Sequence, residues 1–412
     1  MRLTIDRLSL HADGVATGPE GRVHVAMALP GEEVEGEIAG GRIEAPRIVT
    51  PSAARVRPPC AHYRACGGCA LQHASDDFVA GWKADVVRVA LAGQGLEAPV
   101  AAVETSPPRS RRRATLAGRR TKKGTLVGFH ARASGTVIEI ADCLILRPEL
   151  MAALPALHAA TALGASRKGE VAFTLTLSEA GLDVAAQGGK KPDDPALFEA
   201  LAGLARSHDL ARLSWNGETV AARRPAAQQF GRAHVVPPAG AFLQATAEGE
   251  AALLAGVRAA IGAPARVADL FAGAGTFALA LAETAEVHAV EGEAAMVAAM
   301  DQAWRATSGL KHLGTEARDL FRRPLLPDEL AGYDAIVIDP PRAGAEAQVA
   351  QIARSQVPLL AYVSCNPVTF ARDARVLAGA SYVLDWVRVV DQFRWSAHVE
   401  LVARFRLPHI PR

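Results

Sequence analysis

Three reactive side chains in the last third of the chain stand where strands are predicted to end. Asp339 follows an apolar strand predicted over 333–338, Cys365 follows another over 361–364, and Glu291 ends a third. The carboxyl ends of parallel strands meet at one edge of an open α/β sheet, where ligands bind in such folds. We therefore expect these groups to converge on one pocket. A thiol at a loop edge is a candidate nucleophile, and the carboxyls are candidate acid–base or binding groups.

A glycine turn between a strand and a helix is predicted to complete this pocket. The segment 269–276 reads DLFAGAGT, and Gly273 and Gly275 lack a Cβ, so a ligand can approach the backbone and the N–H groups at the helix start. Glu291 lies eighteen residues after Gly273, where an acidic side chain accepts hydrogen bonds from the ribose of an adenosine cofactor. Asp319 is expected to end the next strand or its loop, near the adenine. The turn also fits a dinucleotide site, or a plain turn without ligand.

Four cysteines form a second group of candidate ligands. Cys60, Cys66 and Cys69 lie close together, with two glycines before the third, and Cys143 lies far along the chain. Closely spaced thiolates repel one another unless they share a cation, and zinc and an iron–sulfur cluster both accept four of them. Because the spacing differs from the pattern that leaves one iron open for radical chemistry, we interpret the site as closed and structural.

A run of eight basic residues without an acidic one lies between positions 109 and 123. Its members are Arg109, Arg111, Arg112, Arg113, Arg119, Arg120, Lys122 and Lys123. Apolar residues of a strand-like pattern alternate with the run, which favours a basic sheet face that contacts a phosphate backbone. A solvated surface without a partner is the alternative interpretation.

The composition sets broad limits on the function. The chain of 412 residues is half hydrophobic, which allows two or three domains with their own cores, and its net charge of +2 is too small to indicate nucleic acid by itself. We see no apolar stretch long enough for a membrane span and no signal peptide, so a cytoplasmic location is expected. An odd count of five cysteines there favours metal binding or catalysis over disulfides.

Three segments are predicted to position these groups. Residues 1–57 show short alternating strands, which favour a small five-stranded OB-like β-barrel or a β-rich cap that binds no ligand. Residues 58–240 contain the cysteines and the basic run, and helices at 150–163 and 196–205 join strands there in a central α+β domain. From 241 to 412 strands and helices alternate, which predicts a Rossmann-like α/β domain with an open sheet.

Several motifs resemble those of one known family along essentially the whole chain. They read CAHYRACGGCALQH, SRRRATL, FLQAT, DLFAGAGTF, VEG, DPPRAG, YVSCNP and HVE. Together they resemble the S-adenosylmethionine-dependent RNA 5-methyluridine methyltransferases, in the branch with a TRAM domain and a [4Fe-4S] cluster. The resemblance implies a TRAM barrel at 1–57, a central domain with the cluster at 58–240, and a class I methyltransferase domain at 241–412.

The resemblance also implies a role for each candidate residue. The cluster ligands would be Cys60, Cys66, Cys69 and Cys143. The residues that line the cofactor and uracil pocket would be Gln244, Phe271, Thr276, Glu291, Asp319 and Asp339. Cys365 matches the nucleophile and Glu400 matches the general base. The implied reaction requires a polar, partly exposed site that favours the thiolate of Cys365. It also requires partial burial that raises the pKa of Glu400 toward neutrality.

Some positions depart from the family pattern. Thr246 and Thr276 each stand where an asparagine is usual, and both can still form hydrogen bonds. Asp339 precedes two prolines where many relatives have one, and residues 393–396 read FRWS instead of F-P-x-T. From the sequence alone, Gln244 could equally cap the helix that follows it.

These observations favour an enzyme that methylates carbon 5 of a uridine in RNA through a cysteine adduct at carbon 6, and we expect a monomer. By the resemblance, the barrel and the cluster favour 23S ribosomal RNA as the substrate, and transfer RNA is the alternative because related enzymes with a cluster act on it. Enzymes that methylate exocyclic amines share the DPP motif, but they usually carry an aromatic residue where Arg342 stands. A nicotinamide dehydrogenase explains neither Cys365 nor the basic run. A non-enzymatic RNA-binding scaffold explains only the N-terminal half.

Overall fold

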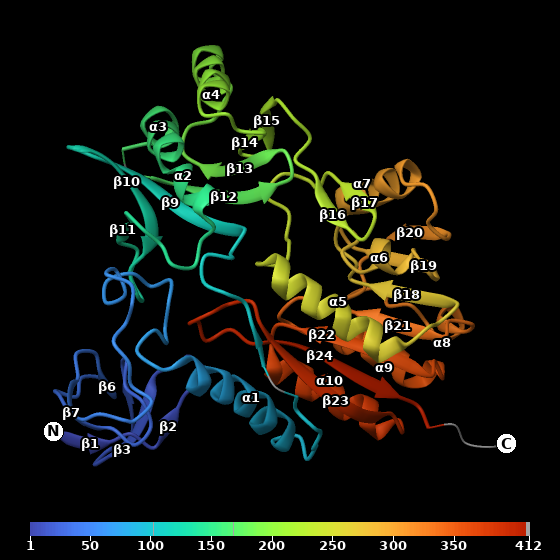
Figure 1. Cartoon of the computed structure of the whole chain (residues 1–412), viewed down its shortest axis with the longest axis horizontal. Helices are drawn as coiled ribbons and strands as arrows, with labels where there is room; N and C mark the ends of the chain where they lie inside the picture. The colour runs from blue at the N-terminus through green and yellow to red at the C-terminus, as the bar shows by residue number, and fades with distance from the viewer. Residues whose placement is uncertain (102, 168, 409–412) are drawn as a thin grey trace.

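The computed structural model describes residues 1–101, 103–167 and 169–408. Three groups of elements follow one another in Figure 1: a small blue group of strands, a green sheet with its helices, and a large yellow-to-red sheet. No helix within these described ranges is long and apolar enough to cross a membrane.

The N-terminal region consists of short strands in two small sheets. The strands are β1 (Arg2–Thr4), β2 (Arg7–Leu8), β3 (Gly14–Gly18), β4 (Gly21–Val25), β5 (Glu33–Glu35), β6 (Arg42–Ile43) and β7 (Arg47–Thr50). The sheets have the orders β1-β5-β7 and β2-β3-β4-β6, and they enclose a core that includes Ile5, Val25 and Val34. The prediction of five strands was therefore wrong, because turns divide the region into seven short strands in two sheets.

A seven-stranded sheet forms the central region, in the order β11-β10-β9-β12-β13-β14-β15. Its strands are β9 (Arg113–Thr121), β10 (Gly124–His130), β11 (Val137–Glu139), β12 (Glu170–Ser178), β13 (Gly181–Gly188), β14 (Arg212–Trp215) and β15 (Glu218–Ala222). The helices are α2 (Pro148–Ala152), α3 (Leu154–Gly164) and α4 (Pro195–Ser207), and their apolar residues share one core with the sheet. The single helix predicted over 150–163 is two helices that meet at Ala153, because Pro155 begins a new helical turn.

The third region is an open sheet of eight strands in the order β20-β19-β18-β21-β22-β24-β23-β8. Its strands are β8 (Glu104–Thr105), β18 (Arg266–Leu270), β19 (Glu286–Glu291), β20 (Leu313–Ala317), β21 (Ala335–Ile338), β22 (Leu359–Ser364), β23 (Val383–Asp391) and β24 (Glu400–Arg406). The strands from β20 to β22 are parallel, whereas β24 is antiparallel to both of its neighbours. The parallel strands therefore end at one edge, as the sequence predicted.

Helices cover this sheet on both faces, and a hairpin precedes it. The helices are α5 (Ala247–Ile261), α6 (Ala278–Leu281), α7 (Ala294–Ala306), α8 (Pro327–Leu330), α9 (Glu346–Ser355) and α10 (Pro367–Gly379), and the hairpin strands are β16 (Gln228–Phe230) and β17 (Ala233–Val235). Two apolar cores result, one on each side of the buried strands, and this two-sided burial explains the continuous apolar runs of β21 and β22.

One segment assigned to the central region by sequence lies against the third sheet instead. Helix α1 (Asp76–Ala92) contributes Val87 and Leu91 to the same core as α10, and β8 pairs with the end of β23. Lys83 of α1 donates to Asp391 Oδ1 at 2.6 Å, and both side chains are buried. An apolar helix face and a buried cation each need a partner, and both partners belong to the C-terminal sheet.

Candidate active site and cysteine cavity

The two glycines in the turn after β18 have different structural roles. Gly273 has a φ of +56°, and a Cβ built there would face open space. Gly275 has a φ of +94°, and a Cβ there would lie 2.9 Å from Met300 Sδ and from Leu279 Cδ1. Phe271 also has a positive φ, of 61°, which is strained for an aromatic residue. Gly273 therefore leaves room for a ligand beside the turn, while Gly275 lets helix α7 pack closely against it.

The predicted ribose-binding and adenine-binding acids lie beside this turn. Glu291, at the end of β19, accepts from the backbone N–H of Gly273 and of Glu293, both at 2.9 Å. Asp319 lies in the loop after β20, and its Oδ1 accepts from Phe321 N at 3.0 Å. Each carboxylate oxygen keeps a lone pair beyond these bonds, so both acids can still accept from a ligand.

Asp269 is a candidate that was not selected from the sequence, although it begins the DLFAGAGT motif. Its side chain is fully buried, and neither carboxylate oxygen has a hydrogen-bond partner among the described residues. Burial, together with the charges of Asp339 and Glu291, holds the pKa of this carboxyl well above its usual value. An orphaned buried carboxyl beside an open glycine turn suits a ligand that brings an amine or another positive group.

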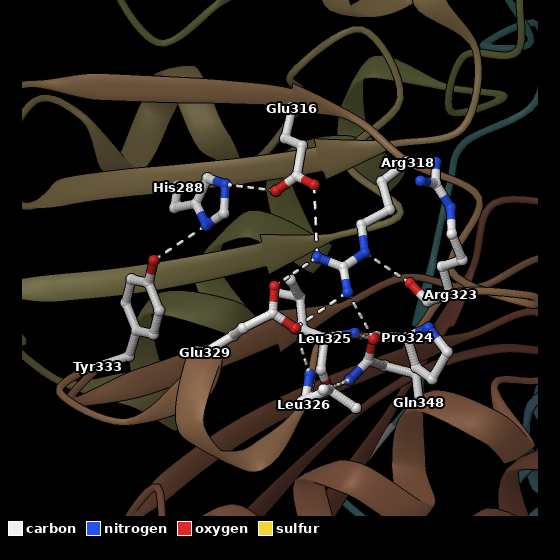
Figure 2. Close-up of polar contacts among 10 residues, drawn as sticks. All are labelled: His288, Glu316, Arg318, Arg323, Pro324, Leu325, Leu326, Glu329, Tyr333 and Gln348. Carbon is white, nitrogen blue, oxygen red and sulfur yellow. Dashed lines mark hydrogen bonds and ion pairs between the residues drawn. The ribbon is translucent and has the colours of Figure 1, made fainter.

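A network centred on Arg318 holds the loop that carries Asp319 (Figure 2). The guanidinium donates to Glu329 at 2.6 Å, to the carbonyl of Arg323 at 2.7 Å and to the carbonyl of Pro324 at 2.8 Å. The bonds from Arg318 lower the pKa of Glu329 to about 2, so this pair stays charged at neutral pH. The same loop places Phe321 against Phe271, with ring centroids 5.3 Å apart. The loop is thus fixed on the side where an adenosine would lie.

Figure 2 also shows His288 of β19 between two partners. Its Nδ1 pairs with the hydroxyl of Tyr333 at 2.9 Å, and its Nε2 lies 3.2 Å from Glu316. Burial lowers the pKa of His288, and Glu316 opposes that shift. We assign this histidine to the support of the strands, because its ring nitrogens are engaged by protein groups.

Asp339, Cys365 and Glu400 lie at the ends of neighbouring strands, whereas Glu291 ends β19, which β18 separates from β21. Asp339 follows β21, Cys365 follows β22, and Glu400 begins β24. Burial raises the pKa of Asp339 to about 7, and burial with the charge of Asp339 raises the pKa of Glu400 to about 8. The expected upward shift of Glu400 is therefore present.

The environment of Cys365 differs from the expectation in one respect. The side chain is partly exposed, as predicted, but its surroundings do not favour the thiolate. Burial, followed by the charges of Glu400 and Asp339, raises the pKa of Cys365 to about 11, and Arg342 opposes this shift. The expectation was wrong because burial, and after it the charges of the two acids, disfavours the thiolate.

Gln244 is buried beside Asp339. Its Oε1 accepts from Gln392 Nε2 at 2.5 Å, and its own amide group donates to Asp339 Oδ2 at 3.4 Å. The alternative that Gln244 caps the next helix is wrong. Thr246 is the cap of α5, because its hydroxyl accepts from Gly249 N at 2.9 Å.

Arg109, the first residue of the basic run, pairs with Asp142 at 3.1 Å, and the other seven residues divide into two parts. Arg112 pairs with Glu250 in a mostly buried ion pair, and Arg113 donates to the carbonyl of Ala241 at 3.0 Å. Arg111 lies 5.5 Å from the ring centre of Phe393. These three side chains point into the junction with the third region, so the prediction that they face phosphates was wrong. The outer part comprises Arg119, Arg120, Lys122 and Lys123, near the turn from β9 to β10.

The four candidate cluster cysteines line a single cavity of about 80 Å³. Burial raises the pKa of Cys69 to about 12 and also raises those of Cys66 and Cys143, with smaller contributions from the neighbouring thiols. Arg111 lines the same cavity. Within the part of the chain that the structure describes, no three His, Cys, Asp or Glu side chains are arranged to hold a metal ion. The structure thus brings the thiols around one space without gathering them as ligands of one ion.

Comparison with solved structures defines the class of fold. The chain matches the Pyrococcus abyssi tRNA (uracil-54, C5)-methyltransferase, solved in complex with S-adenosyl-L-homocysteine, with a TM-score of 0.76 and 22% sequence identity. The match covers 98% of this chain and 99% of the other. The protein therefore has an α/β methyltransferase fold, with its further regions in the same overall arrangement.

Comparison of sequences gives the family. The profile of the tRNA (uracil-5-)-methyltransferase family matches residues 310–404. An RNA methyltransferase of Brucella suis is 45% identical over 98% of this chain and 97% of its own length. The 23S rRNA (uracil(1939)-C(5))-methyltransferase RlmD of Chromohalobacter salexigens is 36% identical over 97% of this chain and 87% of its own length. The chain belongs to the S-adenosylmethionine-dependent RNA uracil-C5 methyltransferases.

Proposed function

We propose that this enzyme methylates carbon 5 of one uridine in 23S ribosomal RNA, with Cys365 as the nucleophile and Glu400 as the base. The observation that carries the proposal is the convergence of Cys365, Glu400 and Asp339 at neighbouring strand ends, where the charges of the two carboxyls act on the thiol. The full-length similarity to an RlmD supports ribosomal RNA as the substrate.

The first step needs the Cys365 thiolate. Carbon 5 of uracil is a weak nucleophile, and addition of sulfur to carbon 6 moves the π electrons of the ring toward carbon 5 and oxygen 4. With a pKa of about 11, Cys365 is a thiol in the free protein at neutral pH. S-adenosylmethionine, when bound, supplies the methyl group and brings a positive charge. A positive charge near Asp339 and Glu400 offsets the two carboxyls that disfavour the thiolate.

The last step needs a base. Once carbon 5 carries the methyl group, Glu400 takes the proton from that carbon, the bonding pair restores the double bond between carbons 5 and 6, and the carbon–sulfur bond breaks to release the Cys365 thiolate. The net change replaces the hydrogen on carbon 5 by a methyl group and releases one proton. With a pKa of about 8, Glu400 has the basicity for this transfer near neutral pH.

Other residues of the pocket bind and orient. Gln244 and Asp339 face the polar edge of the uracil, which must first leave its stack at a cost of a few kcal/mol. Gly273, Glu291 and Asp269 surround the space beside the glycine turn, where the ribose hydroxyls and the amine of the cofactor find acceptors. The remaining proposed cofactor contacts are Phe271, Thr276 and Asp319.

We also propose that Cys60, Cys66, Cys69 and Cys143 hold a [4Fe-4S] cluster with a structural role. The donor set fits, because four thiols line one cavity and a cluster binds each cysteine through a different iron, so the sulfurs need not meet around one ion. Bound there, the cluster would cross-link the segment of residues 60–69 to Cys143. We further propose a TRAM domain in the N-terminal region, an RNA-binding surface at Arg119 and Lys122, and a cytoplasmic monomer.

Transfer RNA is the second candidate substrate, and one observation favours it. The full-length structural match and the family profile both carry tRNA uracil methyltransferase names. The test offers purified enzyme and S-adenosylmethionine to unmodified 23S ribosomal RNA and to transfer RNA, and maps 5-methyluridine by mass spectrometry. Methylation of ribosomal RNA at one site is the expected result. Methylation confined to transfer RNA would contradict ribosomal RNA as the proposed substrate. Absence of 5-methyluridine from both RNAs would contradict the proposed reaction.

A further inference from the structure

We propose that Gln392 is a positioning residue that fixes the orientation of both Gln244 and Glu400 in the reaction. The inference rests on the proposed roles of those two residues. Gln392 follows the end of β23 and is buried between Gln244 and Glu400, but it was not among the candidates from the sequence.

The side-chain amide of Gln392 has a partner for each of its groups. Its Oε1 accepts from the backbone N–H of Ala245 at 2.7 Å. Its Nε2 donates to Glu400 Oε2 at 2.9 Å and to Gln244 Oε1 at 2.5 Å. A backbone N–H can only donate, so it must face the oxygen of Gln392, and this contact decides which way the amide points. Both N–H groups are thereby directed at the two catalytic-pocket residues.

This orientation determines what Gln244 can offer to the substrate. Because Gln244 Oε1 is occupied by Gln392, its NH₂ group must point the other way, toward Asp339. The pocket therefore presents an N–H donor, which suits a carbonyl oxygen of uracil. Without Gln392, the amide of Gln244 could turn over and present its oxygen instead.

The same amide also favours the ionised form of Glu400. Donation from Gln392 lowers the pKa of Glu400, while burial and the charge of Asp339 raise it. Cys365 is the other titrating group that faces Glu400. Nearby Lys83 and Asp391 form their own buried pair. Removal of the donor should therefore raise the pKa of the base and leave more of it protonated at neutral pH.

The test follows decay of the methylated protein–RNA adduct in single-turnover experiments at different pH values. Gln392→Met keeps an unbranched side chain of similar length and removes both donors. The adduct should still form, and its decay near pH 7 should be about tenfold slower. The acid limb of the pH–rate profile, where the decay rate rises with pH, should shift to higher pH by about one unit. Decay rates of variant and wild type should converge above that limb, because Glu400 is then ionised in both. A merely structural loss would slow decay equally at all pH values.

Gln348→Met is the matched control, because Gln348 is another fully buried glutamine whose amide bonds only the backbone of Leu325 in Figure 2. This control should lower thermal stability without moving the limb. Gln392→Glu is a second variant of the same shape, and its added carboxyl should also move the limb upward.

The outcomes distinguish failure of the positioning role of Gln392 from failure of the proposed function. If either Gln392 variant is folded and its limb coincides with that of wild type, the positioning role is overturned. If wild-type enzyme forms neither adduct nor 5-methyluridine, the proposed function itself has failed.

Discussion

The sheet edge that holds the proposed catalytic residues and the cysteine cavity both gather acidic groups in buried surroundings. They differ in how firmly the protein holds those groups in place. At the sheet edge, the amide of Gln392 joins Gln244 and Glu400 through bonds of 2.5 and 2.9 Å. In the cavity, sulfur contacts are weaker, as in the 3.4 Å bond from Gly68 N to Cys66 Sγ. Strand ends fix side chains before any ligand binds, whereas loops leave the final arrangement to what they bind. The scaffold thus holds the side chains of the first site in place, and the proposed cluster would complete the second.

The largest effect is expected where the scaffold already fixes the reacting groups. Cys365→Ala should bind RNA and cofactor but lose methyl transfer by roughly four orders of magnitude or more, because no adduct can form. Glu400→Gln should transfer the methyl group and then stall, with adduct decay slowed about 10²- to 10⁴-fold. Gel electrophoresis of labelled RNA should show a stable covalent species with Glu400→Gln and none with Cys365→Ala. Normal turnover by Glu400→Gln would remove Glu400 from the mechanism.

Changes in the cysteine cavity should affect the proposed cluster and the stability of the fold, and not the chemical step. Protein purified without oxygen should be brown and contain about four irons per chain. Cys69→Ser should lose iron and at least about 3 kcal/mol of the free energy of unfolding, because ligand binding adds to folding. Metal analysis and thermal unfolding measure both. Stoichiometric zinc in the wild-type protein, or an unchanged stability of the variant, would contradict the proposal for this cavity.

Because of the buried carboxyls at the sheet edge, the free energy of unfolding should fall as the pH rises. Asp339 and Glu400 have pKa values of about 7 and 8, above their usual values of 3.8 and 4.5, so the folded protein holds protons that the unfolded chain has released. The thermal midpoint of the ligand-free protein should therefore fall as pH rises from about 4 to 8. Asp269→Asn should flatten this fall and weaken cofactor binding. A midpoint that rises over this range would contradict the assigned shifts.

The smallest effect should separate the two parts of the basic run. Replacing Arg119 and Lys122 by alanine should flatten the dependence of log affinity for RNA on log salt by roughly 0.7 to 0.9 per lost contact. Arg112→Ala is the control, because Arg112 is paired with Glu250, and it should lower stability while leaving the salt slope in place. Equal salt slopes for the double variant and wild type would show that the outer residues form a solvated surface that does not contact RNA phosphates.

The placement of Asp339 and Cys365 at one edge of the sheet could be predicted from the sequence because parallel strands repeat one geometry. Once strands are placed by their apolar runs, the residues after them must share an edge, and this locates Asp339 and Cys365 without further knowledge. The role of Gln392 could not be found in this way. It depends on the antiparallel return of β23 beside β24 and on a contact with the backbone of Ala245, and neither leaves a local pattern.

Two other parts of the structure depended on distant partners in the same way. Arg111 and Arg112 resemble surface charges in the sequence, but each has a partly buried partner more than a hundred residues away in the chain. Helix α1 shows no change of composition that would separate it from the central region. Its position follows only from the core that α10 provides.

The pairing of α1 with the end of β23 has a consequence for synthesis of the chain. Lys83 and Asp391 are separated by 308 residues, and β24 lies between β22 and β23 in the sheet. A nascent chain therefore carries α1 through the synthesis of the whole central region before its apolar face and its ammonium group find their partners. Contacts of such sequence separation form slowly and leave apolar surface exposed during elongation. The C-terminal region is thus expected to mature late, after the last strands of its sheet have been synthesised.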